Sequence, residues 1–408
     1  MDTILKQLSP MKTGKELLFS MTVLPPYDPN ICTQSPTDRL MALSAIYDVY
    51  IPSSMSIEIY SKLYLALLRS LQKKEGRTAQ IQRNENHKRI HQRESNSILG
   101  GSDSFTIIGI SGIGKSTAIN RAIDLISEKG ILENTYTKII PCLLVQCPHD
   151  CSVKGLLLEI LRQTDTILNS DFYPKAIKNR VTTDMLIGNV AQIAINHIGI
   201  LIVDEIQNVV QNKNGTALIS MLTQLINSSG ISIAMVGTPE CTVFFEQAMQ
   251  LARRSLGLYY SVAEYDQFFY DFCTTIFRYQ YVKNQTNISD SIVRWLYDHS
   301  GGIISVVISL IHDSQEIAIL NGTETMNLDN LNTAYKKRLA MLHSYIDPST
   351  TKSKTTVRKK QIIAISPPLE SEPNTDKLIS TISATAKEQK ADVVSLLQKH
   401  ILIEEIHL

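Results

Sequence analysis

Eight consecutive residues, Gly109 to Ser116, have the types and the spacing of a phosphate-binding loop: Gly-Ile-Ser-Gly-Ile-Gly-Lys-Ser. Glycines let such a loop wrap closely around phosphate oxygens and turn successive backbone N–H groups towards them. Lys115 supplies a charge for the β and γ phosphates of a nucleotide, and the Ser116 hydroxyl is a ligand for Mg²⁺. The residues expected to bind the nucleotide are Gly109, Ser111, Gly112, Ile113, Gly114, Lys115, Ser116 and Thr117.

Two acidic residues, Asp204 and Glu205, follow an apolar run that begins at Ile198. On a buried strand ending beside the phosphates, Asp204 is expected to hold Mg²⁺, and Glu205 to polarise the water that attacks the γ-phosphate. An acidic pair after a strand is by itself more often a capped turn. Together with the glycine-rich loop, the pair predicts hydrolysis of ATP and argues against a GTPase or a small-molecule kinase.

A further polar side chain, Thr238, follows the apolar segment Ile231–Val236. If this strand lies beside the first one, Thr238 reaches the γ-phosphate and reports its presence; an ordinary strand-to-loop turn is the alternative. Arg253 and Arg254 come about fifteen residues later, where one arginine can enter a neighbouring subunit's site and stabilise the charge of the transition state. The residues do not decide between the two arginines, or between this role and a solvated surface.

The elements that must position these side chains are short apolar runs separated by helix-length segments. Phe105–Ile110, Ile139–Val145, Ile198–Val203 and Ile231–Val236 are predicted to be buried strands. Strands spaced in this way form a parallel sheet that is covered on both faces. The fold class predicted is α/β, a parallel sheet with flanking helices that carries the phosphate loop, followed by a helical lid.

The rest of the chain divides by composition. We expect a helical N-terminal extension over residues 1–72, and from Lys73 to Arg93 seven basic residues stand against two acidic ones, which indicates a solvated linker, an exposed helix face or a nucleic-acid contact. The predicted segments are 1–72, a basic polar linker at 73–98, the α/β core at 99–265, the helical lid at 266–345, a second linker at 346–375 and a C-terminal partner-binding helix within 376–408.

The balance of charge limits the partners. Lys and Arg number 40 against 39 Asp and Glu, a formal charge of +1, so any charged partner must be met by local patches. Hydrophobic residues make up 43% of the chain, but none of their runs approaches the roughly 20 residues of a membrane span. We expect a cytoplasmic protein with no membrane partner.

The order of these motifs resembles that of AAA+ ATPases, and more narrowly the TnsC and TniB group of transposition regulators. The narrower resemblance covers roughly residues 20 to 345 and rests mainly on Leu24-Pro25-Pro26-Tyr27, on Tyr50-Ile51-Pro52 and on Leu251-Ala252-Arg253-Arg254. One position departs from the pattern. Ser305 stands where many AAA+ lids carry an arginine, so a second sensor from the lid is not expected.

This resemblance implies a bacterial, DNA-associated regulator of transposition and recombination. Subunits are expected to assemble as a ring or helical filament on duplex DNA when ATP binds, and to disassemble on hydrolysis. Lys138 and Lys154 are candidates for contacts to the DNA backbone, although solvated lysines are common. The resemblance also implies a target-selecting protein and a transposase as partners. Two alternatives stay open: a replication initiator or helicase loader, and a signalling or scaffold NTPase that binds no DNA.

Overall fold

The computed structural model describes residues 4–74, 77–90, 104–133, 137–178, 181–210, 212–242 and 257–340. Within these ranges a six-stranded sheet has the order β2-β3-β4-β5-β1-β6. The strands are β1 (Phe105–Gly109), β2 (Leu132–Glu133), β3 (Lys138–Gln146), β4 (Ile198–Asp204), β5 (Ser232–Gly237) and β6 (Leu258–Tyr260). The short β2 pairs antiparallel with β3, and the other pairings are parallel.

The four long strands confirm the strands predicted from the apolar runs. β1 and β5 are buried along their whole length, and β4 is buried up to Asp204, so apolar side chains are needed on both faces. β1 pairs with β5, with Ile108 opposite Gly237. The ends of β1, β4 and β5 therefore lie at one edge of the sheet, as the placement of Thr238 required.

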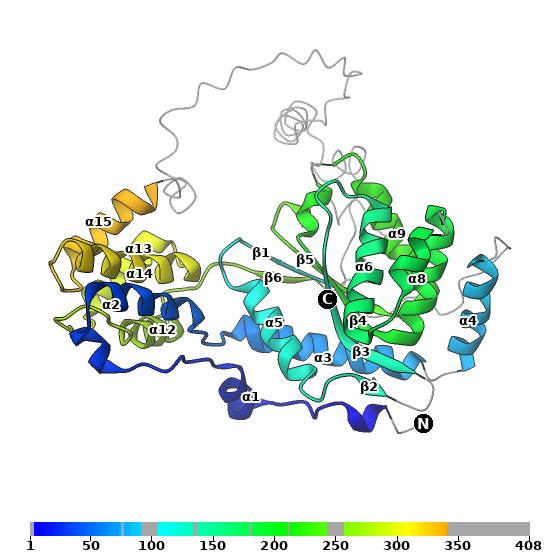
Figure 1. Cartoon of the computed structure of the whole chain (residues 1–408), viewed down its shortest axis with the longest axis horizontal. Helices are drawn as coiled ribbons and strands as arrows, with labels where there is room; N and C mark the ends of the chain where they lie inside the picture. The colour runs from blue at the N-terminus through cyan, green and yellow to red at the C-terminus, as the bar shows by residue number, and fades with distance from the viewer. Residues whose placement is uncertain are drawn as a thin grey trace, which may run out of the picture. The chain divides into compact units, whose positions relative to one another are not determined.

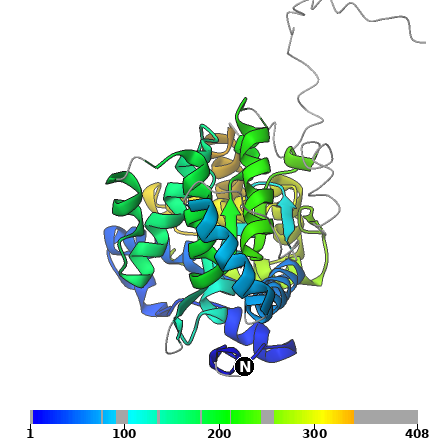
Figure 2. The ribbon, with the colours of Figure 1, turned by 90° about the vertical axis from the view of Figure 1, so that its right-hand side faces the viewer.

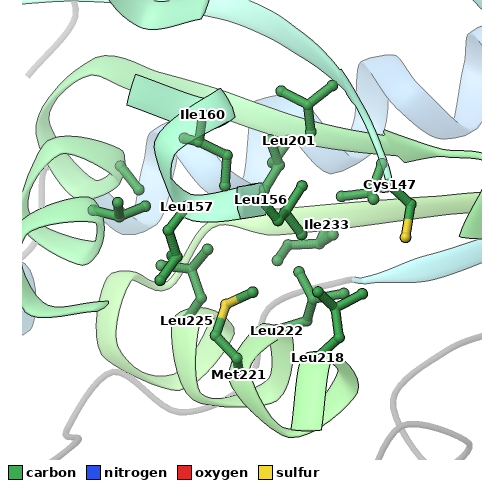
Figure 3. Packing of buried hydrophobic residues seen from close by; sticks show 14 of the residues in the cluster. Cys147, Leu156, Leu157, Ile160, Leu201, Leu218, Met221, Leu222, Leu225 and Ile233 are labelled. Carbon is green, nitrogen blue, oxygen red and sulfur yellow. The ribbon is translucent and has the colours of Figure 1, made fainter. Parts of the chain in front are cut away.

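Among the described residues, one face of the sheet is covered by α6 (Val153–Leu168), α7 (Phe172–Lys178), α8 (Thr183–His197) and α9 (Gly215–Ser229). Figure 3 shows leucines of α6 and α9 meeting over Leu201 and Ile233 of the strands. These side chains belong to one continuous apolar cluster of buried residues. The cluster fixes the strands whose ends carry the acidic pair and Thr238.

The other face is covered by α5 (Lys115–Ile126), α3 (Ser54–Lys74) and α1 (Gly14–Met21), with the short 3-10 helix η1 (Leu5–Gln7) beside them (Figure 1). α3 lies directly on the strands, because Ser70 Oγ donates a hydrogen bond of 2.6 Å to the Gly199 carbonyl. A Cβ at Gly199 would lie 2.4 Å from the Pro141 backbone oxygen and 2.4 Å from Leu67 Cδ1, so this position requires glycine. α3 is thus a layer of the core and not part of a separate extension.

α4 (Arg77–Ile90) occupies part of the segment predicted as a basic linker at 73–98, where a helix face was one of the alternatives. Figure 2 shows it lying in front of α8 and α9, which it contacts. Asn86 Nδ2 donates to the Ser228 carbonyl at 2.9 Å, and Arg83 Nε donates to Asn196 Oδ1 at 2.8 Å. Hydrogen bonds of polar side chains hold α4 against α8 and α9. The spacing of apolar residues therefore did not predict this packing.

The lid consists of α12 (Gln267–Phe277), α13 (Asp290–Ser300), α14 (Ile304–Leu320) and α15 (Leu328–Arg338). α13 is followed by the cap residue Gly301, whose φ of 59° lies in the left-handed region that glycine adopts without strain. The helical character and the break at Gly301-Gly302 confirm the prediction. No single helix in the described ranges is long and apolar enough to cross a membrane; α13 and α14 meet that test only as a pair, bent by 120° at their break.

Residues 24–50, here called the strap, pack on the lid. They include the 3-10 helix η2 (Pro29–Thr33), α2 (Pro36–Leu43) and the 3-10 helix η3 (Ser44–Asp48). Leu43, Ile46 and Val49 join the apolar cluster of the lid, whereas α1 and α3 join that of the sheet. The helical character expected of residues 1–72 is present in the described part, and their apolar faces are divided between core and lid. The segments predicted at 346–375 and 376–408 lie outside the described residues.

Candidate active site

The loop between β1 and α5 has the backbone shape that its glycines predict. Gly112 and Gly114 have φ values of 85° and 97°, which residues other than glycine rarely adopt. α5 begins directly after Gly114, and no side chain caps its N-terminus. The first N–H groups of α5 are therefore free to bind an anion, and the helix dipole favours negative charge there.

The Lys115 ammonium lies inside this loop. Its Nζ donates hydrogen bonds to the carbonyls of Gly109 at 2.6 Å and Ile110 at 2.9 Å. Burial lowers the pKa of Lys115, and the nearby carboxylates of Asp204 and Glu205 oppose that shift. The two carbonyl contacts hold the charge at the mouth of the loop, where a phosphate can replace them.

Asp204 and Ser116 come together from β4 and α5. Ser116 Oγ donates to Asp204 Oδ2 at 3.2 Å, and the Glu205 N–H donates to Asp204 Oδ1 at 2.8 Å. The Asp204 carbonyl accepts from the Cys147 N–H at 2.8 Å, which continues the ladder with β3. A hydroxyl and a carboxylate in contact are hard oxygen ligands, so these two residues fit Mg²⁺.

Glu205 turns the chain away from the strand. It has φ 58° and ψ 34°, a left-handed conformation that is uncommon for a side-chain-bearing residue and is often found at functional sites. Its exposed carboxylate accepts a hydrogen bond from Gln207 Nε2 and borders the same cavity as Lys115. This placement agrees with the predicted role of Glu205 towards water.

Thr238 stands directly after β5. Its Oγ1 is buried and has no hydrogen-bond partner in the described structure. A buried hydroxyl without a partner is costly, and a phosphate oxygen in the cavity would satisfy it. Thr238 is therefore in position for the sensor role predicted from the sequence.

These residues enclose one cavity of about 240 Å³. Its lining comprises Ser111, Gly112, Gly114, Lys115, Ser116, Thr117, Asp204, Glu205, Gln207, Gly237, Thr238 and Ser305. Two predicted loop residues do not line it: Gly109 offers its carbonyl to Lys115, and the Ile113 side chain packs in the apolar cluster. The motifs did not predict a role for Gln207 or Ser305.

Ser305 brings the lid to the phosphate loop. Its N–H donates to the Gly112 carbonyl at 3.1 Å, and a Cβ at Gly112 would lie 2.4 Å from Ser305 Oγ. Ser305, which stands where many AAA+ lids carry an arginine, thus makes a close contact with the backbone of the phosphate loop. A longer side chain at either residue would push the lid away from the loop.

A second cavity of about 120 Å³ adjoins the loop and is mostly apolar. It lies between the strap, the phosphate loop and the lid, and its lining includes Tyr50, Met55, Ile113, Phe268 and Ile308. No motif predicted these contacts, because the residues come from three distant parts of the chain. The stretch Tyr50-Ile51-Pro52 was the one available signal.

The remaining predicted residues are not brought together. Arg253 and Arg254 lie outside the described residues. Lys138 begins β3 and pairs with Glu133 at 3.1 Å, whereas Lys154 lies exposed in the first turn of α6, after the opposite end of β3. At about 3.3 Å per residue the strand separates its two ends by about 26 Å, so the two lysines do not form one patch.

Comparison with known proteins identifies the fold to which the sheet and its phosphate loop belong. A family model described as "AAA domain" matches residues 99–244. No curated protein matches the chain. With the strand order and the loop, this match identifies the fold as an AAA+ P-loop ATPase fold, a mostly parallel sheet with flanking helices and additional helical extensions. The narrower resemblance to the TnsC and TniB group stays a prediction.

Solved structures with similarity to parts of this chain include these three. The ORC1 protein of Aeropyrum pernix in complex with DNA has a TM-score of 0.42 at 13% identity, over 64% of this chain and 65% of its own. The ORC2 protein of the same organism in its ADP form has a TM-score of 0.40 at 16% identity, over 65% and 67%. A Walker-type ATPase of Pyrococcus abyssi has a TM-score of 0.36 at 10% identity, over 66% and 76%. The chain thus spans about two thirds of the first two structures.

Proposed function

We propose that this protein binds ATP with Mg²⁺ and hydrolyses it. The observation that carries the proposal is the meeting of Lys115, Ser116, Asp204, Glu205 and Thr238 around one cavity. They follow three different strands and have the types needed for phosphate binding, metal binding and water activation. A fold that only bound a nucleotide would not need the carboxylate of Glu205 beside it.

The phosphates are held by the loop and its lysine. The N–H groups of the loop and of the first turn of α5 bind phosphate oxygens, and Lys115 exchanges its two carbonyl partners for the β and γ phosphates. Ser116 and Asp204 would hold Mg²⁺, which neutralises phosphate charge when it is bound. The protein contributes position and electrostatic stabilisation, the main requirements of phosphoryl transfer.

The attack on the γ-phosphate uses Glu205 and Thr238. Glu205 takes a proton from the attacking water as the new oxygen–phosphorus bond forms and the bond to the β-phosphate oxygen breaks. Thr238 donates its hydroxyl hydrogen to the γ-phosphate, which ends the isolation of its buried Oγ1. ADP leaves with the bonding electron pair.

The apolar cavity beside the loop is proposed to hold the base. Its lining of aromatic and aliphatic side chains suits the flat face of adenine. Since strap and lid both contribute to it, the base and the phosphates together touch all three parts of the described molecule.

The wider proposal is an ATP-dependent regulator of transposition that assembles on duplex DNA and links target-site selection to a transposase. It is supported by the resemblance of the sequence motifs to the TnsC and TniB group. ATP binding drives assembly and hydrolysis drives disassembly in this proposal, and Arg253 or Arg254 completes the neighbouring subunit's site. Lys138 and Lys154 are proposed contacts to DNA phosphates.

Two substitutions test the ATPase proposal. Lys115→Ala removes charge-assisted hydrogen bonds to phosphate and is expected to weaken ATP binding about tenfold to hundredfold. Glu205→Gln keeps the size of the side chain but not the base, so kcat should fall at least about a hundredfold while ATP still binds. Phosphate release and binding of a fluorescent ATP analogue measure the two effects. Hydrolysis by Glu205→Gln at the parental rate would contradict the proposal.

A further inference from the structure

Gln207 is a polar residue of the phosphate cavity with no role assigned above. It lies in the 3-10 helix η4 (Ile206–Val209), two residues after Glu205, and lines the cavity with Glu205 and Thr238. Its Nε2 donates a hydrogen bond to Glu205 Oε2. The side chain therefore touches the carboxylate that is proposed to activate water.

The chemistry of the partner determines which way the Gln207 amide points. A carboxylate only accepts hydrogen bonds, so the NH₂ group must face Glu205 and the carbonyl oxygen Oε1 must lie on the other arm. Oε1 is buried and has no hydrogen-bond partner in the described structure. It lies at the edge of β5, since a Cβ at Gly237 would be 3.1 Å from it.

The atom that satisfies this oxygen must be a hydrogen-bond donor. Ionised phosphate oxygens only accept, and so does a carboxylate. The neighbouring Thr238 hydroxyl is also unpartnered, so in this structure it does not donate to Gln207. A water molecule has two hydrogens and fits a cavity of this size and polarity, and a small rotation of the Gln207 side chain would bring the buried Oε1 to the cavity surface.

We propose that Gln207 holds the attacking water together with Glu205, an inference that rests on the proposed ATPase function. Glu205 accepts one hydrogen of the water and Gln207 Oε1 accepts the other, while Gln207 Nε2 keeps the Glu205 carboxylate in place. The two contacts leave a lone pair of the water oxygen free for the γ-phosphorus. Thr238 keeps its hydrogen for the γ-phosphate.

The steps balance with water and ATP alone. The oxygen of the water bonds to the γ-phosphorus, and its first hydrogen passes as a proton to Glu205. The second hydrogen stays on the phosphate that forms, still bonded to Gln207 Oε1. The bond between the γ-phosphorus and the bridging oxygen breaks, and ADP takes its electron pair. No oxidant or other co-reactant is required.

Gln207→Met tests the inference, because methionine has a similar length and no amide. We expect kcat for ATP hydrolysis by the full chain to fall about tenfold to hundredfold, with the KM for ATP and the affinity for a fluorescent ATP analogue within about twofold of the parent. A purely structural role would instead lower ATP affinity or the melting temperature. Gln207→Asn, whose carbonyl is one methylene too short, should show the same fall in kcat and serves if the methionine variant does not fold.

The matched control is Gln163→Met on α6. Gln163 Nε2 also donates to a glutamate, Glu159 Oε1 at 2.7 Å, but it does not line the cavity. This variant should hydrolyse ATP at the parental rate.

A double variant separates the two roles. If Gln207 and Glu205 act on one water, adding Gln207→Met to Glu205→Gln should lower kcat by much less than the product of the two single effects. Parental kcat in both Gln207 variants, with Glu205→Gln inactive, would overturn this inference and leave the ATPase proposal standing. Absence of hydrolysis by the parent with ATP and Mg²⁺ would overturn both.

Discussion

Single buried polar atoms carry much of the chemistry in this molecule. Thr238 Oγ1 and Gln207 Oε1 are both buried without a partner at the cavity, and both gain one in the proposed reaction. Glu205 keeps a left-handed backbone conformation that directs its carboxylate to the same place. Folding alone does not account for these arrangements, because the two unpartnered atoms cost stability until a ligand arrives and the backbone conformation of Glu205 costs stability throughout.

Lys74 is a polar side chain that is buried away from the cavity, and its burial predicts a dependence of stability on pH. Its Nζ donates to the carbonyls of Ala194 and Ile198 at the end of α8, and burial holds its pKa well below the usual value of 10.5. Between the lowered pKa and 10.5 the unfolded chain binds more protons at this residue than the folded chain. The contribution of Lys74 to the free energy of unfolding should therefore rise with pH across that window.

Lys74→Met removes this titration while keeping the length of the side chain. Urea unfolding of parent and variant at pH 7 and pH 9.5 measures the difference between their free energies of unfolding. The free energy of unfolding of the parent should rise relative to that of the variant at the higher pH. A difference that is the same at both pH values would show that Lys74 is charged in the folded state.

Among the elements, α3 and the strap connect the N-terminal region to two different parts of the molecule, the sheet and the lid. α3 packs beneath the strands, and the strap closes on the lid through Tyr27, whose hydroxyl donates to the Gln280 carbonyl at 2.5 Å. Tyr279 returns a contact of 3.0 Å to the Pro25 carbonyl. One continuous stretch of chain thus joins the two parts that face the cavity, so its removal should affect the lid as well as the core.

The ion pair Arg39–Glu324 allows the contribution of a strap contact to stability to be tested. Arg39 is fully buried, its two terminal nitrogens donate to Glu324 at 2.6 and 2.7 Å, and Nη1 also donates to the Tyr281 carbonyl at 3.0 Å. Removing one partner of a buried ion pair typically costs about 3–5 kcal/mol. Arg39→Met should lower the free energy of unfolding by about that amount in urea titrations.

Arg162→Met provides the comparison for this prediction. Arg162 also forms two hydrogen bonds to a glutamate, Glu159, at 2.6 and 2.8 Å, but its side chain is 54% exposed. Its loss should cost far less than the loss of Arg39, because water replaces the contacts of an exposed pair. Equal costs for the two variants would mean that burial does not make the Arg39–Glu324 pair stronger than an exposed one.

For the whole molecule, the near-zero charge bears on how DNA is bound. With a net charge of +1, one subunit would have little general attraction for DNA, so under the proposed assembly an array of subunits would supply the contacts jointly. Lys154 is exposed in the first turn of α6, whereas Lys138 is paired with Glu133. Of the two proposed contacts, Lys154 is therefore the more available to a phosphate.

Binding to duplex DNA tests the assembly proposal. With ATP and Mg²⁺, binding should weaken steeply as salt rises, and each phosphate contact adds about 0.9 to the slope of log affinity against log salt. Lys154→Ala should reduce that slope, whereas Lys175→Ala, whose lysine pairs with Asp171 at 2.7 Å, should not. Filter binding over a salt series and electron microscopy measure affinity and order. DNA binding that is independent of ATP and of Lys154 would contradict this part of the proposal.

The sequence by itself determined the features that depend on neighbouring residues. The buried strand Ile198–Asp204, the loop at Gly109–Ser116 and the break at Gly301 each follow from residue types within a few positions, because backbone geometry and strand burial are local. The positions of Lys115, Asp204 and Thr238 beside one cavity could be predicted because their motifs stand at the ends of such strands.

Only the tertiary structure decided how distant segments meet. Gln207 and Ser305 reach the cavity through a backbone turn and a lid contact that no local pattern encodes. α4 is held by hydrogen bonds such as that of Asn86 to Ser228, and the strap by Arg39 and Glu324, which are 285 positions apart. Such contacts depend on which buried polar groups find partners in the folded chain, and the spacing of apolar residues carries no record of that choice.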